Sequence, residues 1–324
     1  MKKSAIILHA NTLIFAPEKR HQMNLKSSFL RPPDQVIQSK RKEINIFNID
    51  GKNIDKKVVQ EFGEEWLKFS EFTDKSINEA AEEYFDIIDE SMVNSQTYAL
   101  DIGCGTGRWT KYLSTKAGFI EAIDPSNAIF AAGKLLEDVE NVRLTKASVE
   151  TLPFADETFD FGMSIGVLHH IPDTQQALTD CVKKIKKGGH FYVYLYYDLD
   201  KRGILFKTLF SIVNAVRLTV SKLPNNSKKI VCDILAIVIY LPLVLLGQFF
   251  SAIGLKKIAK ATPLSYYQNK TFFIIRNDAL DRFGTRLEQR FSKEQIIEMM
   301  RQSGLTNIKV SPGVPYYHAV GKKL

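Results

Sequence analysis

Three glycines at alternate positions form the clearest candidate for a ligand-binding loop in this sequence. Gly103, Gly105 and Gly107 follow the apolar run 98–102 and precede a segment with helical spacing. Glycine lets a backbone turn tightly and approach a ligand without an intervening Cβ, and the first turn of the next helix offers free N–H groups. The same pattern is also typical of an ordinary strand-to-helix turn, so the neighbouring residues decide its meaning.

Two acidic residues accompany these glycines. Asp101 precedes Gly103, and Asp124 ends the next apolar run. A carboxylate at the end of that second strand is placed to accept hydrogen bonds from both hydroxyl groups of a ribose. The alternative for Asp124 is structural, because Asp124-Pro125-Ser126 also has the composition of a turn and helix cap.

Two adjacent histidines, His169 and His170, follow the fourth apolar run. An imidazole titrates near neutral pH, so either side chain is a candidate for proton transfer at a strand end. The alternative is that the pair packs or caps the following turn.

The elements that must position these residues are predicted from 96 to 200, where short apolar runs alternate with helical segments. The runs cover 98–102, 119–123, 142–145, 159–165 and 191–195, a pattern typical of βαβ units and a mostly parallel sheet. The pattern returns at Ser292 and Gln295, which have the spacing of a capping box, followed by strands at 307–310 and 316–320. We therefore expect an α/β fold interrupted by an insertion.

The predicted organisation has five parts. Residues 1–57 are basic and without a sustained period, which indicates a flexible tail, and 58–95 form a helical N-terminal cap. The core covers 96–200, an apolar and basic insertion covers 201–284, and 285–324 complete the core with a helix and a hairpin. The charged and apolar start at 1–16 also has the composition of a secretory signal, with a poorly ordered tail as the alternative.

Six motifs in order resemble class I, Rossmann-like S-adenosylmethionine-dependent methyltransferases, and in particular the branch with quinone-biosynthesis and small-molecule enzymes. They are Ala99-Leu-Asp-Ile-Gly-Cys-Gly-Thr-Gly107, Ala122-Ile-Asp-Pro-Ser126, Glu150-Thr-Leu-Pro-Phe154, Phe159-Asp-Phe161, Val167-Leu-His-His-Ile-Pro-Asp173 and Lys187-Gly-Gly189. The resemblance covers roughly 97–196 and 285–324. It implies a seven-stranded, mostly parallel sheet with helices on both faces, S-adenosyl-L-methionine as cofactor, and methyl transfer to an O, N or C atom of a small-molecule acceptor.

The resemblance also implies which residues hold the cofactor. Its amino-acid end is expected at Asp101, Gly103, Cys104, Gly105 and Gly107, the ribose at Asp124 and Pro125, the adenine at Ser148 and Val149, and the methyl donor at Gly166 and Val167. Many family members carry an aspartate where this chain has Ser148, which puts the adenine contact in doubt. The segment Phe62-Gly-Glu-Glu-Trp66 resembles a cap whose aromatic side chains close over the cofactor, with core packing as the alternative.

The insertion contains 22 consecutive residues without a charged side chain, Ile234–Leu255, between the pairs Lys228-Lys229 and Lys256-Lys257. Length and composition suit a transmembrane helix, but a single crossing would separate the last strands from their sheet. Two arrangements remain: a helical lid over the acceptor, or a hairpin that contacts the bilayer. Residues 201–280 hold 12 basic and 2 acidic side chains, a balance suited to an anionic membrane surface.

The last sequence features bear on metal binding, cellular location, partners and alternative functions. Three separated cysteines give neither a zinc site nor a disulfide framework, so no metal is predicted and a cytoplasmic location is favoured, with the inner face of the membrane as a refinement. Basic residues interleaved with aliphatic runs disfavour nucleic acid as a partner. A nicotinamide-dependent oxidoreductase and a membrane-surface binding protein with a degenerate fold are the alternative functions; the first expects a third glycine at Thr110.

Overall fold

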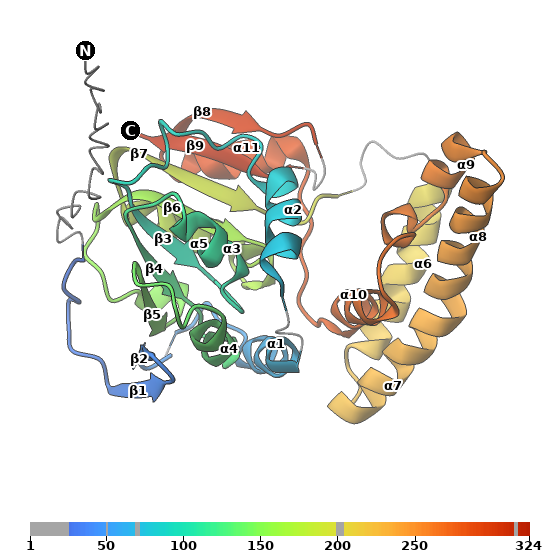
Figure 1. Cartoon of the computed structure of the whole chain (residues 1–324), viewed down its shortest axis with the longest axis horizontal. Helices are drawn as coiled ribbons and strands as arrows, with labels where there is room; N and C mark the ends of the chain where they lie inside the picture. Colours follow the sequence, from blue (N-terminus) through green and yellow to red (C-terminus); the bar gives the residue numbers. More distant parts are fainter. Residues whose placement is uncertain (1–25, 50, 69–71, 199–203, 314–316) are drawn as a thin grey trace, which may run out of the picture.

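One nine-stranded sheet forms the centre of the protein, in the order β1-β2-β5-β4-β3-β6-β7-β9-β8 (Figure 1). The computed structural model describes residues 26–49, 51–68, 72–198, 204–313 and 317–324. The secretory signal or poorly ordered tail predicted over 1–16 falls within residues 1–25, which lie outside the described part of the chain.

Seven of the strands correspond to the predicted α/β core. Its parallel strands are β3 (Tyr98–Ile102), β4 (Phe119–Ile123), β5 (Val142–Lys146), β6 (Phe159–Ile165) and β7 (Ile185–Tyr194). Strand β9 (Ala319–Lys323) pairs antiparallel with both β7 and β8 (Leu305–Val310). The chain builds outward from β3 on one side and then continues with β6 on the other, so the switch point where ligands bind lies at the end of β3. The predicted fold class is confirmed.

The other two strands correct the prediction of a flexible tail over 1–57. Strands β1 (Gln35–Ser39) and β2 (Lys42–Ile46) form a hairpin, and β2 extends the sheet by pairing parallel with β5. Ile44 and Phe47 are fully buried against the core, which supplies the stabilisation. The tight turn between these strands contains Lys40 with φ of 53°, so the turn lacks the asparagine or glycine that marks such hairpins in a sequence.

Helices cover both faces of the sheet. On one face, α2 (Asp74–Tyr84), α3 (Arg108–Ser114) and α4 (Ala128–Leu135) contribute to one hydrophobic core, and α1 (Lys56–Lys68) packs on α4. On the other face, α5 (Thr174–Lys183) and α11 (Lys293–Gln302) contribute Leu178 and Ile296 to a second core. The capping box predicted at Ser292 and Gln295 is confirmed, with both reciprocal hydrogen bonds formed.

The insertion forms a separate helical body beside the sheet, at the right of Figure 1. Its elements are α6 (Ile204–Val220), α7 (Asn225–Leu235), the π-helical turn η3 (Ala236–Tyr240), α8 (Leu241–Ala252), α9 (Lys256–Ala261), η4 (Ser265–Tyr267) and α10 (Phe272–Gly284). Helices α7 and α8 continue into one another through η3, just before Pro242, whose ring crowds the preceding turn. Cys232, Tyr240, Ile275 and Phe283 belong to a third hydrophobic core inside this body.

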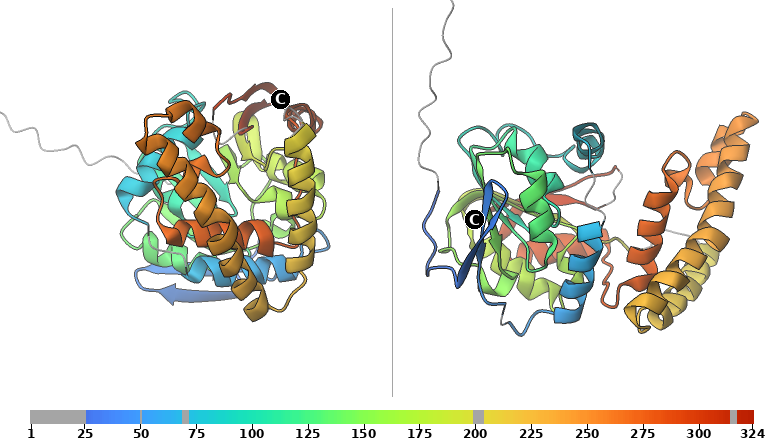
Figure 2. Two further views of the ribbon diagram at one scale, coloured as in Figure 1. Left: turned by 90° about the vertical axis from the view of Figure 1, so that its right-hand side faces the viewer. Right: turned by 60° about the horizontal axis from the view of Figure 1, so that its bottom comes forward.

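Two segments connect the insertion to the sheet, and they run side by side as a stalk. The stalk comprises 195–198, after β7, and 285–291, before α11. A backbone bridge joins Tyr197 and Phe291, and the Asp198 N–H donates to the Phe291 carbonyl at 2.9 Å. The two further views in Figure 2 show the insertion as a layer in front of the sheet and as a body beside it. One ion pair, Lys228 Nζ to Glu61 Oε1 at 2.7 Å, links α7 to α1.

Candidate active site

The glycine loop lies at the end of β3 and turns back against the end of β4. The N–H groups of Gly103 and Cys104 both donate to the Ile123 carbonyl, at 2.7 and 2.9 Å. Gly103 has φ of 76°, and a Cβ there would lie 2.4 Å from a methyl carbon of Val167. Gly105 has φ of 56° with no atom within 4 Å of its missing Cβ. Gly103 is therefore fixed by packing, whereas Gly105 borders open space.

Asp124 ties the loop to the next strand. One carboxylate oxygen accepts from the Gly105 N–H at 2.9 Å, and the other accepts from the backbone N–H and hydroxyl of Ser126 at 2.8 and 2.6 Å. The side chain is buried, which raises the pKa of this carboxyl, while these hydrogen bonds act in the opposite direction. Asp124 therefore shapes the turn, as its structural alternative required, and it also lines the cavity described next.

A cavity of about 540 Å³ opens over the glycine loop and extends to the insertion. Ten residues predicted for the site line it: Gly103, Cys104, Gly105, Asp124, Pro125, Ser148, Val149, Gly166, Val167 and His170. They come from the ends of β3, β4 and β6 and from the turn after β5, so the carboxyl edge of the parallel strands brings them together. In the cavity wall, Ser148 Oγ forms a hydrogen bond with Thr151 Oγ1 at 2.9 Å. Burial raises the pKa of the Cys104 thiol.

Asp101 and Gly107 do not line this cavity, contrary to the prediction of direct cofactor contacts. Asp101 is buried beneath the loop and accepts a hydrogen bond from Thr110 Oγ1 at 2.6 Å. Burial, with a smaller contribution from the nearby Asp124 carboxyl, raises the pKa of Asp101 to about 7 against the opposing effect of the Thr110 hydrogen bond. Gly107, with φ of 83°, begins α3. Both residues shape the loop from behind.

The two histidines have different surroundings. The ring of His169 is fully buried, stacks on Tyr196 at 4.0 Å, and finds no hydrogen-bond partner among the described residues. Burial lowers its pKa, and it does not line the cavity, so the structure gives this ring no access to the site at which the base was predicted. His170 does line the cavity, and its Nδ1 lies 2.7 Å from the Leu287 carbonyl.

A carbonyl only accepts, so Nδ1 of His170 carries the hydrogen and donates it to Leu287. Burial lowers the pKa of this imidazole, which favours the neutral ring. In that tautomer Nε2 is left as a hydrogen-bond acceptor. His170 is therefore the one member of the predicted pair with the protonation state and position of a proton acceptor at the cavity.

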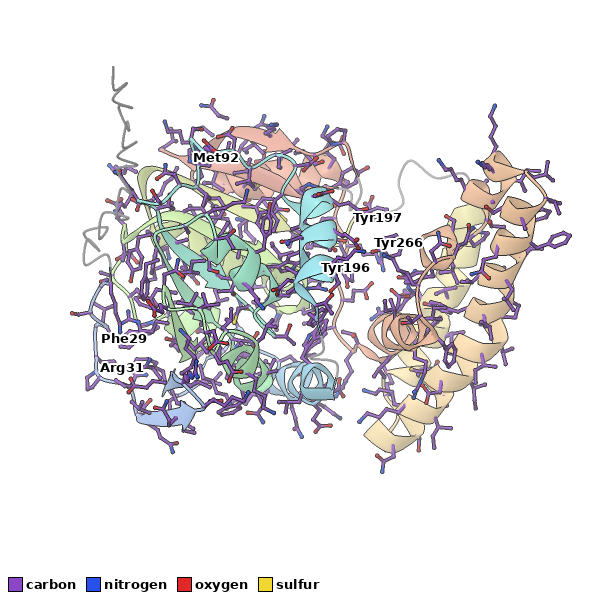
Figure 3. All side chains as sticks on the ribbon, in the orientation of Figure 1. Phe29, Arg31, Met92, Tyr196, Tyr197 and Tyr266 are labelled. Carbon is purple, nitrogen blue, oxygen red and sulfur yellow. The ribbon has the colours of Figure 1, made fainter. Side chains whose placement is uncertain are left out.

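Aromatic side chains form much of the remaining wall. Phe62 and Trp66 of α1 line the cavity, as the predicted cap requires, and the Phe62 ring lies 4.8 Å from that of His170. The other aromatic lining residues are Tyr84, Trp109, Tyr194, Tyr196, Tyr197, Tyr266 and Tyr267. Figure 3 shows Tyr196 and Tyr197 of the core and Tyr266 of the insertion near one another, between the two bodies.

Sequence reasoning missed the tyrosines after β7, and it named no residue of the insertion for the site although a lid over the acceptor was one of its two alternatives. The alternation of tyrosines at 192, 194 and 196 was the available signal, because it continues past the end of the strand. The insertion adds Asp278 and Arg282, and the stalk adds Glu288 and Arg290, whose charged groups pair at 2.6 Å. One end of the cavity is thus glycine-rich backbone, and the other is aromatic and charged.

Within the described part of the chain, no three His, Cys, Asp or Glu side chains are grouped to hold a metal ion. All three cysteines are buried and free.

Comparison with known proteins finds similarity over part of the chain. Residues 100–193, from β3 to β7, match a family model described as a methyltransferase domain. The demethylmenaquinone methyltransferase of Staphylococcus aureus (strain JH9) is 38% identical over 102 residues, covering 30% of this chain and 42% of that protein. The chain therefore matches less than half the length of such curated relatives.

Solved structures are similar to this chain only at low sequence identity. Human N-acetylserotonin methyltransferase in complex with S-adenosylmethionine is 14% identical with a TM-score of 0.47, over 81% of this chain and 56% of that one. An S-adenosylmethionine-dependent methyltransferase from Aquifex aeolicus is 12% identical with a TM-score of 0.40, over 78% and 98% of the two chains.

Proposed function

We propose that this chain, which carries a class I S-adenosylmethionine-dependent methyltransferase domain, transfers the methyl group of that cofactor to an apolar small-molecule acceptor. The observation that carries the proposal is the cavity over the glycine loop, whose two ends differ in chemistry. Backbone and small side chains form the end at β3. Aromatic side chains form the end at the insertion, together with the ion pairs Asp278–Arg282 and Glu288–Arg290, whose charges offset one another. The first suits a nucleoside with an amino-acid tail, and the second suits an apolar acceptor.

We assign the cofactor to the end built on β3, β4 and β6. Open space beside the Gly105 backbone supports this assignment, because a ligand can approach there without meeting a Cβ. Asp124 and Pro125 lie at the ribose position implied by the resemblance, Ser148 and Val149 at the adenine position, and Gly166 and Val167 at the sulfonium position. When bound, the cofactor supplies a methyl group on a positively charged sulfur.

We assign proton transfer to His170. Its Nε2 is the free acceptor of the ring, and the cavity gives it access to the same space as the acceptor. If the acceptor presents an O–H or N–H group, the proton leaves to Nε2 as the methyl group arrives. The positive charge lost at sulfur then appears on the imidazole, which balances the step.

The first experiment measures which cofactor binds. Calorimetry should show binding of S-adenosylmethionine and S-adenosylhomocysteine and none of NAD. Thr110 occupies the position where a dinucleotide fingerprint expects glycine, and its buried hydroxyl is bonded to Asp101. Binding of NAD alone would reverse the choice in favour of the oxidoreductase, and binding of neither would favour the degenerate surface-binding protein.

Asp124→Ala should weaken S-adenosylmethionine binding by about tenfold or more, because hydrogen bonds to a carboxylate contribute roughly 1.5–3 kcal/mol each. Asp173→Ala is a matched control. Asp173 also caps a turn, accepting from the Gln176 N–H at 2.9 Å, but it does not line the cavity. If both variants bind the cofactor as the native protein does, Asp124 does not belong to the site.

The acceptor is best sought by metabolite profiling of a strain without this protein, in search of a species that lacks one methyl group. A second variant tests the insertion, with residues 204–284 replaced by a short Gly-Ser linker. The stalk already holds Asp198 against Phe291, so a short linker can close the gap. We expect cofactor binding to survive and methylation of the acceptor to be lost. Normal methylation by that variant would remove the insertion from the acceptor site.

We also propose that the reaction takes place in the cytoplasm, at the inner face of the membrane. The cytoplasm supplies S-adenosylmethionine, and an apolar acceptor is most concentrated in a bilayer. Separation of cell extracts into soluble and membrane fractions, with immunodetection of the native protein, tests this location.

A further inference from the structure

Helix 226–252, which runs through α7, η3 and α8, presents an apolar stripe to the outside of the insertion. Its inward residues, among them Cys232, Tyr240 and Val244, are buried in the insertion's own core. The stripe lies on the opposite side and consists of Ile230, Ile234, Ile237, Val238, Leu245 and Phe249, with Ile253 at the C-cap directly after the helix, each more than half exposed. The spacing of these residues follows the helical repeat, so they form one continuous surface about seven turns long.

This helix is the one among the described residues that is long and apolar enough to cross a membrane, yet only 28% of its most apolar stretch is buried. A soluble core helix of that composition would be largely covered. A crossing is excluded by connectivity, because β9 returns to pair with β7 in the sheet. The helix must therefore meet an apolar environment along one side while the rest of the protein stays outside.

Basic side chains flank the stripe. Lys256, Lys257 and Lys260 are exposed on α9, directly after the helix, and Lys222 is exposed in the turn before it. The two acidic residues of 201–280 are already paired with arginine. Asp233 bonds to Arg276 at 2.6 Å, and Asp278 lies 3.3 Å from Arg282. An apolar stripe with cationic ends complements an anionic phospholipid surface, whose headgroups bind lysine while the acyl boundary accepts the stripe.

We propose that helix 226–252 docks in the plane of an anionic bilayer, with the stripe in the headgroup and acyl boundary and the α9 lysines on lipid phosphates. This inference deepens the proposed function and rests on it for one point, that the acceptor is apolar. Docked in this way, the insertion holds the wall of the cavity that contains Tyr266 and Tyr267 next to the source of the acceptor. The sheet and the glycine loop remain in water, where the cofactor is available.

Sedimentation with vesicles tests the docking without any enzymatic readout. The full-length protein should sediment with vesicles of phosphatidylcholine and phosphatidylglycerol at low salt, and much less with phosphatidylcholine alone. Reversal of Lys256, Lys257 and Lys260 to glutamate should lower the partition coefficient at least a hundredfold, since the loss of each lysine costs about fivefold and each new glutamate adds repulsion. Reversal of Lys116, Lys134 and Lys187, exposed lysines outside the insertion, makes the same change in net charge and should leave binding nearly unchanged.

A second variant tests the stripe itself. Val238→Asp with Phe249→Asp places charge at two of its most exposed positions, 65% and 58% exposed, where the substitutions remove little packing. Vesicle binding should be lost while thermal unfolding and S-adenosylmethionine binding stay as in the native protein. Native protein that stays in solution with anionic vesicles at low salt would overturn the proposal. So would a concentration-dependent dimer that this variant dissociates, because the stripe would then belong to a second copy of the chain.

The two proposals fail separately. If the protein binds vesicles but not the cofactor, the docking proposal stands and the methyltransferase proposal fails. If it binds the cofactor but not vesicles, the methyltransferase proposal stands and the docking proposal fails.

Discussion

A methyl group added at Gly105 tests whether the open space over the loop is the cofactor site. Gly105 has φ of 56° and no atom within 4 Å of its missing Cβ. In Gly105→Ala the left-handed backbone costs about 1–2 kcal/mol, a small part of the 5–15 kcal/mol typical of a folded domain. The Cβ then projects into the cavity. Because overpacking by one methyl group typically costs 1–3 kcal/mol, S-adenosylmethionine should bind roughly 5- to 150-fold more weakly.

Two further glycines give matched comparisons. Gly304, which follows α11, has φ of 89° and equally open surroundings but does not line the cavity. Gly304→Ala should therefore cost the same backbone strain and leave cofactor affinity unchanged. At Gly103 the new Cβ would meet Val167 at 2.4 Å, so Gly103→Ala should lose more stability than either and weaken binding by displacing the loop.

The assay is calorimetric titration with S-adenosylmethionine, combined with thermal unfolding of each variant without ligand. If Gly105→Ala unfolds like Gly304→Ala but binds the cofactor as the native protein does, the space beside Gly105 is not where the cofactor lies, and the assignment of the loop fails.

Three other predictions follow from single residues. Asp101 has a pKa of about 7 in the folded chain against 3.8 in the reference state, so the folded state loses stability as pH rises between these values. The free energy of unfolding of Asp101→Asn, measured with denaturant, should therefore rise relative to that of the native protein by on the order of 1–4 kcal/mol between pH 4 and pH 8. A difference that stays constant over this pH range would contradict the prediction. Glu61→Gln leaves Lys228 buried without its carboxylate, at a cost of roughly 3–5 kcal/mol, so hydrogen exchange should accelerate in α7 and not in the strands. Ile44→Ala should destabilise the fold by roughly 2–5 kcal/mol, whereas a residue in a flexible tail would cost nothing.

The core was predictable from sequence because its signals are local. Each parallel strand is a short apolar run between turn residues, and the glycine loop and Asp124 keep a fixed relation to the ends of those runs. The hairpin of β1 and β2 lacked such a signal, since Lys40 replaces the usual turn residue and few of its side chains are buried.

The role of each site residue depends on the direction of its side chain, which the spacing of residues in the sequence does not reveal. His169 and His170 are adjacent in the 3₁₀ turn η2 (Leu168–His170), yet one ring turns into the core and the other lines the cavity. Asp101 looked like a ligand contact because it precedes the loop, but strand alternation turns its carboxylate beneath the backbone. The tyrosines contributed by the insertion lie some 70 residues from β7 in sequence, and only the folded stalk brings them to the site.

The paired stalk also determines how the enclosed space can be entered. Backbone hydrogen bonds join the two segments of the stalk, so these segments should bend together and resist twisting. The insertion can then move as one rigid body about a single axis. Domain motions of this kind occur on the microsecond to millisecond timescale, and product release through them often limits turnover. We therefore expect product release to depend on the stalk at Tyr197 and Phe291, and a burst of product before steady turnover would be the kinetic sign.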